Sequence, residues 1–134
     1  MKTDSNCIFC KIIQGDLPCY KIYEDEVCLA FLDLYPINTG QTLIVPREHE
    51  DHLWDIDQNI YKHLFDIAKE LSLVLRKTYA SKRVGMMVEG FQMPHAHIII
   101  LPIYKGSDSQ KKPTKANQDD LAKEAQKIIS NIDI

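Results

Sequence analysis

The spacing of apolar residues changes along this chain, and the change predicts where strands give way to a helix. The first third contains short runs rich in β-branched and aromatic residues, at 20–24, 27–32 and 41–46. Runs of this length and composition are typical of β-strands. Asp25-Glu26 separates the first two runs, which predicts a hairpin. The segment 33–40, DLYPINTG, has the composition of a loop.

The period then lengthens to that of an α-helix. A helix is predicted over 58–79, with Asp57 as its N-cap. Its apolar positions, three or four residues apart, are Ile60, Leu64, Ile67, Leu71, Val74 and Leu75.

The remaining segments complete an α+β pattern. Strands are predicted at 84–90 and 95–102, and a short helix near 121–132 capped by Asp119 or Asp120. We therefore expect one domain over 1–134, with a mainly antiparallel sheet of about five strands, one long helix and a short C-terminal helix. Residues 1–5 are expected to be flexible, and 105–120 to form a polar, mobile loop.

Composition and charge limit the kinds of partner. The 134 residues are 45% hydrophobic and 26% charged, as in ordinary globular domains. A net charge of −3 argues against binding to nucleic acid polymers or anionic membranes, but allows a small phosphate ligand. The first twenty residues lack the apolar segment of a signal peptide, so we expect a cytoplasmic protein. Its cysteines would then be reduced, and Cys19 and Cys28 are interpreted as ordinary half-buried thiols.

The segment MPHAHIIILP, residues 93–102, contains the strongest candidate for chemistry. On a strand, His95 and His97 would share one face with Ile99 and Leu101. Ala96, Ile98 and Ile100 would form a buried layer on the other face. Two imidazoles on an apolar strand are costly to bury without partners. They are either two partnered core histidines, or a nucleophile or base beside a ligand or orienting group.

Three segments resemble the signature blocks of the histidine triad (HIT) family. They are CIFCKIIQGDLPCYKIYED, AFLDLYPINTGQTLIVPREH and EGFQMPHAHIIILP, in the family's order, between residues 6 and 104. The resemblance implies a HIT-like fold and a homodimer that binds nucleotides and hydrolyses or transfers nucleoside monophosphates. In the family, the middle histidine attacks the α-phosphorus and forms a covalent nucleotidyl intermediate.

The resemblance assigns roles residue by residue. His97 resembles the nucleophile, and its second ring nitrogen would be held by a carbonyl or carboxyl oxygen. Asp33 resembles the residue that accepts hydrogen bonds from the ribose, and Gln92 stands near the phosphate and leaving group. The apolar walls of the base pocket correspond to Ile8, Phe9, Ile12 and Phe31, which could equally be core residues.

Two positions depart from the family pattern. Ile99 and Gln41 stand where the family usually has histidines. Gln41 could still donate a hydrogen bond to a phosphate oxygen and is kept as a catalytic candidate, whereas Ile99 cannot. The nucleophile is therefore present, but with fewer supporting groups.

Cys7 and Cys10 form a CxxC pair at the start of the first block. A CxxC pair followed by separated histidines is a recurring zinc pattern. By resemblance to family members with a CxFC opening, the ligand set is Cys7, Cys10, His49 and His95. Four such ligands imply a structural zinc and no open position for water. The alternative is an unmetallated thiol pair; a redox role is disfavoured because no βαβ pattern surrounds the cysteines.

These observations favour a nucleotidyl hydrolase that cleaves purine nucleoside phosphoramidates or dinucleoside polyphosphates, with no organic cofactor. A catalytically weakened nucleotide- or partner-binding protein is the alternative, motivated by Gln41 and Ile99. A nucleotidyl transferase is a third possibility. His52 and His63 are interpreted as surface residues.

Overall fold

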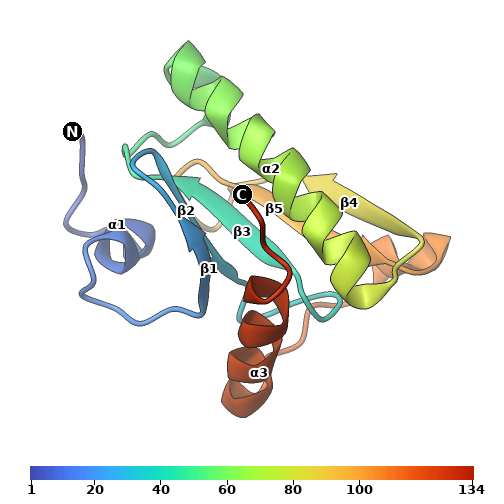
Figure 1. The fold of residues 1–134 in the computed structure, drawn as a ribbon. Helices are drawn as coiled ribbons and strands as arrows, with labels where there is room; N and C mark the ends of the chain where they lie inside the picture. Colours follow the sequence, from blue (N-terminus) through green and yellow to red (C-terminus); the bar gives the residue numbers. More distant parts are fainter.

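The computed structural model describes residues 1–134 and is built around one antiparallel sheet of five strands, in the order β1-β2-β3-β5-β4 (Figure 1). All four neighbouring pairs are antiparallel. The strands are β1 (Lys21–Glu24), β2 (Cys28–Leu32), β3 (Thr42–Pro46), β4 (Arg83–Met87) and β5 (Ile98–Ile103). The α+β class and the number of strands expected from the sequence are confirmed.

Three α-helices and two short 3₁₀ turns surround the sheet: α1 (Ile8–Ile13), η1 (Leu53–Asp55), α2 (Gln58–Tyr79), η2 (Gly106–Gln110) and α3 (Gln118–Ile129). The long helix has the predicted bounds, and the Asp57 side chain accepts hydrogen bonds from the backbone N–H groups of Asn59 and Ile60. No helix combines the length and the apolar character needed to cross a membrane.

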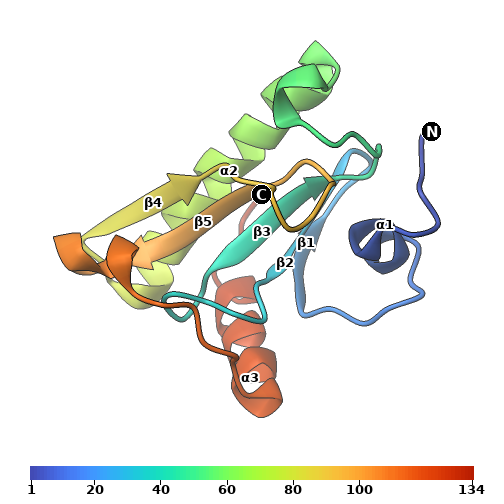
Figure 2. The same cartoon turned by 180° about the vertical axis from the view of Figure 1, so that it is seen from behind.

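The two faces of the sheet are covered differently. Helices α2 and α3 lie on one face, where a cluster of 19 buried residues forms the main core (Figure 1). Viewed from behind, the other face carries only α1, near β1 and β2, and the connection between β4 and β5 (Figure 2). A smaller cluster of seven buried residues lies on that face, and it includes Cys7, Phe9 and Cys10. The second face is therefore covered by fewer elements than the first.

The strand that follows the two histidines is shorter at its start than predicted. It begins at Ile98, so His95 and His97 lie in the segment that leads into it. The N–H of Ala96 donates to the carbonyl of Glu50, which is outside the sheet. The alternation of faces is nevertheless as expected, because Ala96, Ile98 and Ile100 all belong to the main core.

The C-terminal segments also differ from expectation. Helix α3 begins before Asp119, because the side chain of Asn117 caps it by accepting from the N–H groups of Asp119 and Asp120. Part of the predicted polar loop folds as η2. Buried Asp108 organises this turn, since its carboxylate accepts from the N–H groups of Tyr104 and Lys105. A buried carboxylate with several donors fixes local backbone that composition alone would assign to a loop.

Candidate functional site

The face opposite α2 gathers most of the candidate residues. Phe31 and Leu43 are buried there, and Ile99 packs against them. Because side chains alternate along a strand, Asp33 and Gln41 project from the same face as Phe31 and Leu43, and His97 from the same face as Ile99.

A hydrogen bond and an aromatic contact hold the His97 ring in one orientation. Its Nδ1–H donates to the carbonyl oxygen of His95 at 2.7 Å. A carbonyl can only accept, so Nδ1 carries a proton, and in the neutral ring the lone pair is on Nε2. The ring packs edge-to-face on Phe9, with centroids 5.4 Å apart, and the residue is 7% exposed. This is the geometry required of a nucleophilic imidazole.

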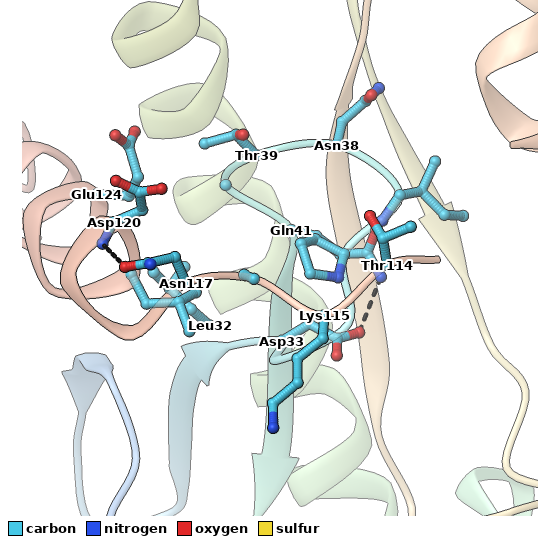
Figure 3. Close-up of a pocket in the computed structure, with 15 residues that line it drawn as sticks. Leu32, Asp33, Asn38, Thr39, Gln41, Thr114, Lys115, Asn117, Asp120 and Glu124 are labelled. Atoms are coloured by element: carbon cyan, nitrogen blue, oxygen red, sulfur yellow. Dashed lines mark hydrogen bonds between the residues drawn. The ribbon is translucent and has the colours of Figure 1, made fainter. Parts of the chain in front are cut away.

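Asp33 and Gln41 form a pair at the other end of the same face (Figure 3). The Nε2 amide of Gln41 donates to Asp33 Oδ2 at 2.8 Å, and its Oε1 accepts from the N–H of Ile37. Gln41 lies just beyond the Thr42–Ile100 pair, whereas His97 precedes Ile98, which pairs with Ile44. The structure therefore does not bring Gln41 to His97.

Asp33 and Gln41 lie in one cavity, and His97 lies in another. Asp33 and Gln41 line a cavity of about 390 Å³, with Thr114, Asn117 and other residues before and within α3 (Figure 3). His97 lines another cavity of about 270 Å³, between residues 51–54 and 88–91.

The expected apolar walls lie close to His97 on the α1 side. The rings of Phe9 and Phe31 meet edge-to-face, with centroids 5.6 Å apart, and Ile12 packs against the same cluster. Ile8 is half exposed, on the outer side of α1. Gln92 is also exposed, in the connection between β4 and β5.

The four expected metal ligands converge from three segments of the chain. One potential donor atom from each of Cys7, Cys10, His49 and His95 lies within 4.8 Å of every other. Cys7 Sγ is 3.4 Å from His95 Nδ1, and Cys10 Sγ is 3.4 Å from His49 Nδ1. The two Nδ1 atoms are 3.1 Å apart, and Cys10 Sγ is 3.6 Å from His95 Nδ1.

These distances match a tetrahedral metal. Zn–S bonds of about 2.3 Å and Zn–N bonds of about 2.05 Å place nitrogen and sulfur about 3.6 Å apart, and two nitrogens about 3.3 Å apart. The four residues could therefore hold a metal ion, as expected from the resemblance.

The environment of His95 supports a ligand role for its Nδ1 atom. Its Nε2–H donates to the carbonyl of Pro46 at 2.8 Å, so the lone pair is on Nδ1, which faces the two cysteines. Burial lowers the pKa of His95 to about 4, so the ring is neutral near pH 7. A backbone carbonyl behind a metal-binding histidine fixes the tautomer and the ring direction.

A second Cys/His cluster was not predicted. Asp25, Cys28 and His63 also have potential donor atoms within 4.8 Å of one another. His63 Nε2 lies 2.6 Å from Asp25 Oδ2, which joins α2 to the β1–β2 turn. His63 is partly exposed, with 35% of its side-chain surface accessible, but it is also paired with Asp25, which the sequence did not predict; His52 is exposed. No local spacing signals this contact, because His63 is 38 residues from Asp25.

Fold and site together define a small α+β domain in which a histidine-bearing segment enters a central strand beside a Cys₂His₂ cluster. The HIT domain model matches residues 14–106, and this chain belongs to the HIT family.

Several named relatives are similar along most of the chain. "Protein hit" of Bacillus subtilis is 32% identical over 98% of this chain and 94% of its own length. The adenosine 5'-monophosphoramidase hnt1 of Schizosaccharomyces pombe is 30% identical, over 72% of this chain and 74% of that protein. The adenylylsulfatase HINT3 of Arabidopsis thaliana is 33% identical, over 73% of this chain and 52% of that protein.

Solved structures share the fold. A HIT-like protein from Bartonella henselae superposes with a TM-score of 0.88 at 23% identity, covering 98% of this chain and all of the other. A zinc-bound histidine triad family protein from Mycobacterium smegmatis superposes with a TM-score of 0.80 at 23% identity, covering 94% and 92%. These two likenesses concern the fold alone.

Proposed function

We propose that the protein is a nucleotidyl hydrolase that cleaves purine nucleoside phosphoramidates or dinucleoside polyphosphates at the α-phosphate. The observation that carries the proposal is the state of His97. Its Nδ1–H is committed to the His95 carbonyl, which leaves Nε2 as the nitrogen available for attack, and the residue lines a cavity of about 270 Å³. Nucleophilic attack on phosphorus requires an imidazole that is held in one orientation beside open space.

The reaction would occur in two displacements. Nε2 of His97 attacks the α-phosphorus, and the bond from phosphorus to the leaving group breaks. Water then attacks the nucleotidyl-histidine and returns the neutral imidazole, with one proton released to solvent. The His95 carbonyl stabilises the positive charge that develops on the ring, because the hydrogen bond that it accepts from Nδ1–H strengthens as the imidazole becomes cationic.

The nucleoside would lie across the sheet face between the two cavities. Phe9, Phe31, Ile12 and Ile8 would supply apolar contacts for the base. Asp33 is assigned to accept from ribose hydroxyls, with the lone pairs that its carboxylate does not use for the N–H of Tyr35 and the amide of Gln41. Gln92 is assigned to the phosphate and leaving group. Relatives named as a monophosphoramidase and an adenylylsulfatase support nucleotide hydrolysis as the general activity.

The deciding experiment is covalent labelling. Incubation with adenosine 5'-phosphoramidate should give an adenylyl adduct on His97, identified by mass spectrometry of tryptic peptides. His97→Asn should remove activity by about 10⁴-fold or more, the loss seen when a covalent nucleophile is deleted. Nucleotide binding and the melting temperature should change little. Turnover that persists in His97→Asn would overturn the proposal.

The Asp33 carboxylate offers an independent test of the nucleoside end. Asp33→Ala should weaken binding of adenosine monophosphate by about 1.5–3 kcal/mol, the range for hydrogen bonds to a charged group. Asp33→Ala also removes the acceptor of the Gln41 Nε2 amide. Adding Gln41→Ala in the same background separates the loss of the carboxylate from the loss of this hydrogen bond. An unchanged dissociation constant in Asp33→Ala would assign the carboxylate to the turn alone, where it accepts from the N–H of Tyr35.

One observation favours a second candidate, a weakened nucleotide- or partner-binding protein. Both polar atoms of the Gln41 amide are engaged by Asp33 and Ile37, and Ile99 offers no hydrogen bond. Tight binding of adenosine monophosphate without adduct formation would favour this candidate. A transferase would instead form the adduct and pass the nucleotide to a phosphate or sugar acceptor in a product screen.

We further propose that the Cys₂His₂ cluster holds a structural zinc. Two thiolates and two neutral imidazoles suit this ion, and four protein ligands leave no open position for chemistry. The metal would tie the N-terminal segment to the sheet beside His97. Bound zinc would also favour the thiolate form of both cysteines.

We also propose a cytoplasmic homodimer. All four cysteines are free thiols, as a reducing compartment would keep them. β4 is an edge strand whose Met86 and Met87 are exposed, as is Val88 directly after it, and unpaired edges tend to associate. Light scattering of the purified protein tests the dimer, and a monomer mass at micromolar concentration would exclude it.

A further inference from the structure

Phe9 lies at the centre of a group of aromatic rings on the second face of the sheet, where α1 packs (Figure 2). Its ring meets those of Phe31, His95 and His97 edge-to-face, with centroids 5.6, 5.8 and 5.4 Å away. Phe9 is only 6% exposed, whereas Ile8, its neighbour in α1, is 47% exposed. The family resemblance assigns Phe9 to the wall of the base pocket, but the protein itself already covers most of this side chain.

The two cysteines of α1 fix the position of the Phe9 ring. Cys7 is the N-cap of the helix, and Cys10 follows Phe9 directly. Their Sγ atoms lie 3.4 and 3.6 Å from Nδ1 of His95. Helix α1 has six residues, and a helix of that length is not stable by itself in water. Its place on the sheet therefore depends on tertiary contacts, and the contacts of these two cysteines flank Phe9 in the sequence.

A hydrogen bond alone does not fix the plane of the nucleophilic ring. The carbonyl of His95 accepts from Nδ1–H of His97 at 2.7 Å. Hydrogen bonds to carbonyl oxygens have a broad range of directions, so the ring could still tilt about this bond. The edge-to-face contact with Phe9 supplies a second constraint, in an arrangement that aromatic rings favour. Together the two contacts fix both the position and the tilt of His97.

The tilt of the ring determines where Nε2 points. In a phosphoryl displacement the attacking and leaving atoms are roughly in line with phosphorus. A displacement of the attacking atom by about 1 Å can slow such a reaction by about 100-fold. Contacts to the base and the ribose do not depend on this angle. A residue that sets the tilt of His97 therefore affects the rate of the chemical step and not the affinity for the nucleotide.

We propose that Phe9 is a positioning residue for His97 and not a wall of the base pocket. The inference rests on the proposed nucleotidyl hydrolase. It assigns Phe9 to the first displacement, in which His97 Nε2 bonds to the α-phosphorus and the electron pair of the breaking bond goes to the leaving group. Phe31, Ile12 and Ile8 remain as the apolar contacts of the base.

The test separates the rate of the chemical step from nucleotide affinity. Phe9→Leu keeps an apolar side chain and removes the ring. With saturating adenosine 5'-phosphoramidate, the single-turnover rate of adenylyl-His97 formation should fall by between about 10-fold and 100-fold. The Kd of adenosine monophosphate and the KM should stay close to the wild-type values, because an interaction that acts only in the transition state changes kcat alone.

Two matched substitutions provide the comparison. Phe31→Leu removes the neighbouring ring, which contacts Phe9 in the same cluster. It should weaken binding of adenosine monophosphate and leave the single-turnover rate at saturation close to the wild-type rate. Phe65→Leu makes the same change on α2, where the partly buried ring packs against the main core on the opposite face. It should change neither quantity.

A spectroscopic measurement follows the His97 ring directly. The Nδ1–H proton of His97 is buried and bonded to the His95 carbonyl, so it should give a slowly exchanging signal in NMR spectra of isotope-labelled wild type. The signal should broaden or disappear in Phe9→Leu, because the ring is free to tilt. It should persist in Phe31→Leu and Phe65→Leu.

The possible failures are distinguishable. A wild-type rate of adduct formation in Phe9→Leu, with a raised Kd or KM, would overturn the inference and return Phe9 to the base pocket. Absence of a His97 adduct in the wild type would overturn the proposed function instead. In that case an equally sharp Nδ1–H signal in Phe9→Leu and Phe31→Leu would overturn the positioning role as well, and loss of the signal in Phe9→Leu alone would support it.

Discussion

Two clusters in this protein contain similar residues. They differ in whether hydrogen bonds within the protein already satisfy their polar atoms. Cys7, Cys10, His49 and His95 form one cluster, and Asp25, Cys28 and His63 form the other. In both, potential metal donors lie within 4.8 Å of one another. The difference shows that proximity of such residues is not sufficient to indicate a metal site.

In the second cluster the acceptors already have donors. One Asp25 oxygen accepts from the N–H groups of Val27 and Cys28, and the other accepts from the hydroxyl of Tyr23 and faces His63. These hydrogen bonds outweigh burial and hold the pKa of Asp25 far below its usual range. Burial raises the pKa of the Cys28 thiol to about 12, so it stays protonated. This cluster is complete without a cation.

In the first cluster the ring nitrogen of His95 that faces the cysteines carries a lone pair, because its Nε2–H donates to the carbonyl of Pro46. His49 Nδ1 lies 3.1 Å from this nitrogen, and neither ring has a carboxylate at hydrogen-bonding distance on this side. Four electron-pair donors around one point are stabilised by a cation at their centre. The following predictions test this contrast, from the largest expected effect to the smallest.

Cys7→Ser/Cys10→Ser should abolish zinc binding and destabilise the fold by about 4 kcal/mol or more, an effect of the size attributed to loss of a metal. The pinned N-terminal segment would detach from the sheet. Metal analysis of freshly purified protein and denaturant unfolding measure the two effects. Cys28→Ser is the matched control and should keep about one zinc per chain. Equal zinc content in Cys7→Ser/Cys10→Ser and Cys28→Ser, or no zinc in the wild type, would contradict the proposed difference between the two clusters.

Asp25→Asn should lower the free energy of unfolding by about 1.5–3 kcal/mol at neutral pH, because hydrogen bonds to a charged carboxylate are lost. Zinc content should not change. Asp66→Asn, an exposed position on α2, provides the control. A loss of zinc in Asp25→Asn would mean that the two clusters are coupled.

The same carboxylate predicts a pH dependence. The folded pKa of Asp25 is depressed below its unfolded value, so its contribution is present above the unfolded pKa of about 3.9 and is lost as the pH falls toward the folded pKa. The stability difference between wild type and Asp25→Asn should therefore be largest near pH 7 and shrink in acid. Urea unfolding at several pH values measures it, and a difference that grows below pH 4 would contradict the assignment.

Cys28→Ala should have the smallest effect, about 1 kcal/mol, since it removes one small buried side-chain atom. Zinc content and the His97 adduct should be unchanged. Loss of metal in this variant, measured by the same analysis, would show that Cys28 belongs to the metal centre.

The amino-acid sequence alone determined the elements that depend on near neighbours. The bounds of α2 and its cap at Asp57 followed from helical spacing and one side chain. The β1–β2 hairpin followed from two apolar runs and a short polar break. The four residues of the Cys₂His₂ cluster followed from the family resemblance, and the structure brings them together.

Tertiary structure decided whatever depends on contacts between distant segments. Asn117 caps α3 in place of the predicted aspartates, and Asp25 meets His63 across 38 residues of sequence. The Gln41 amide is engaged by Asp33 and Ile37 at the end of the sheet away from His97, and the acidic walls beside His97 come from 51–54 and 88–91. The physical reason is that periodicity reports which face of an element is apolar. Which donor reaches which acceptor is fixed only when sheet register and loop packing place them at hydrogen-bonding distance.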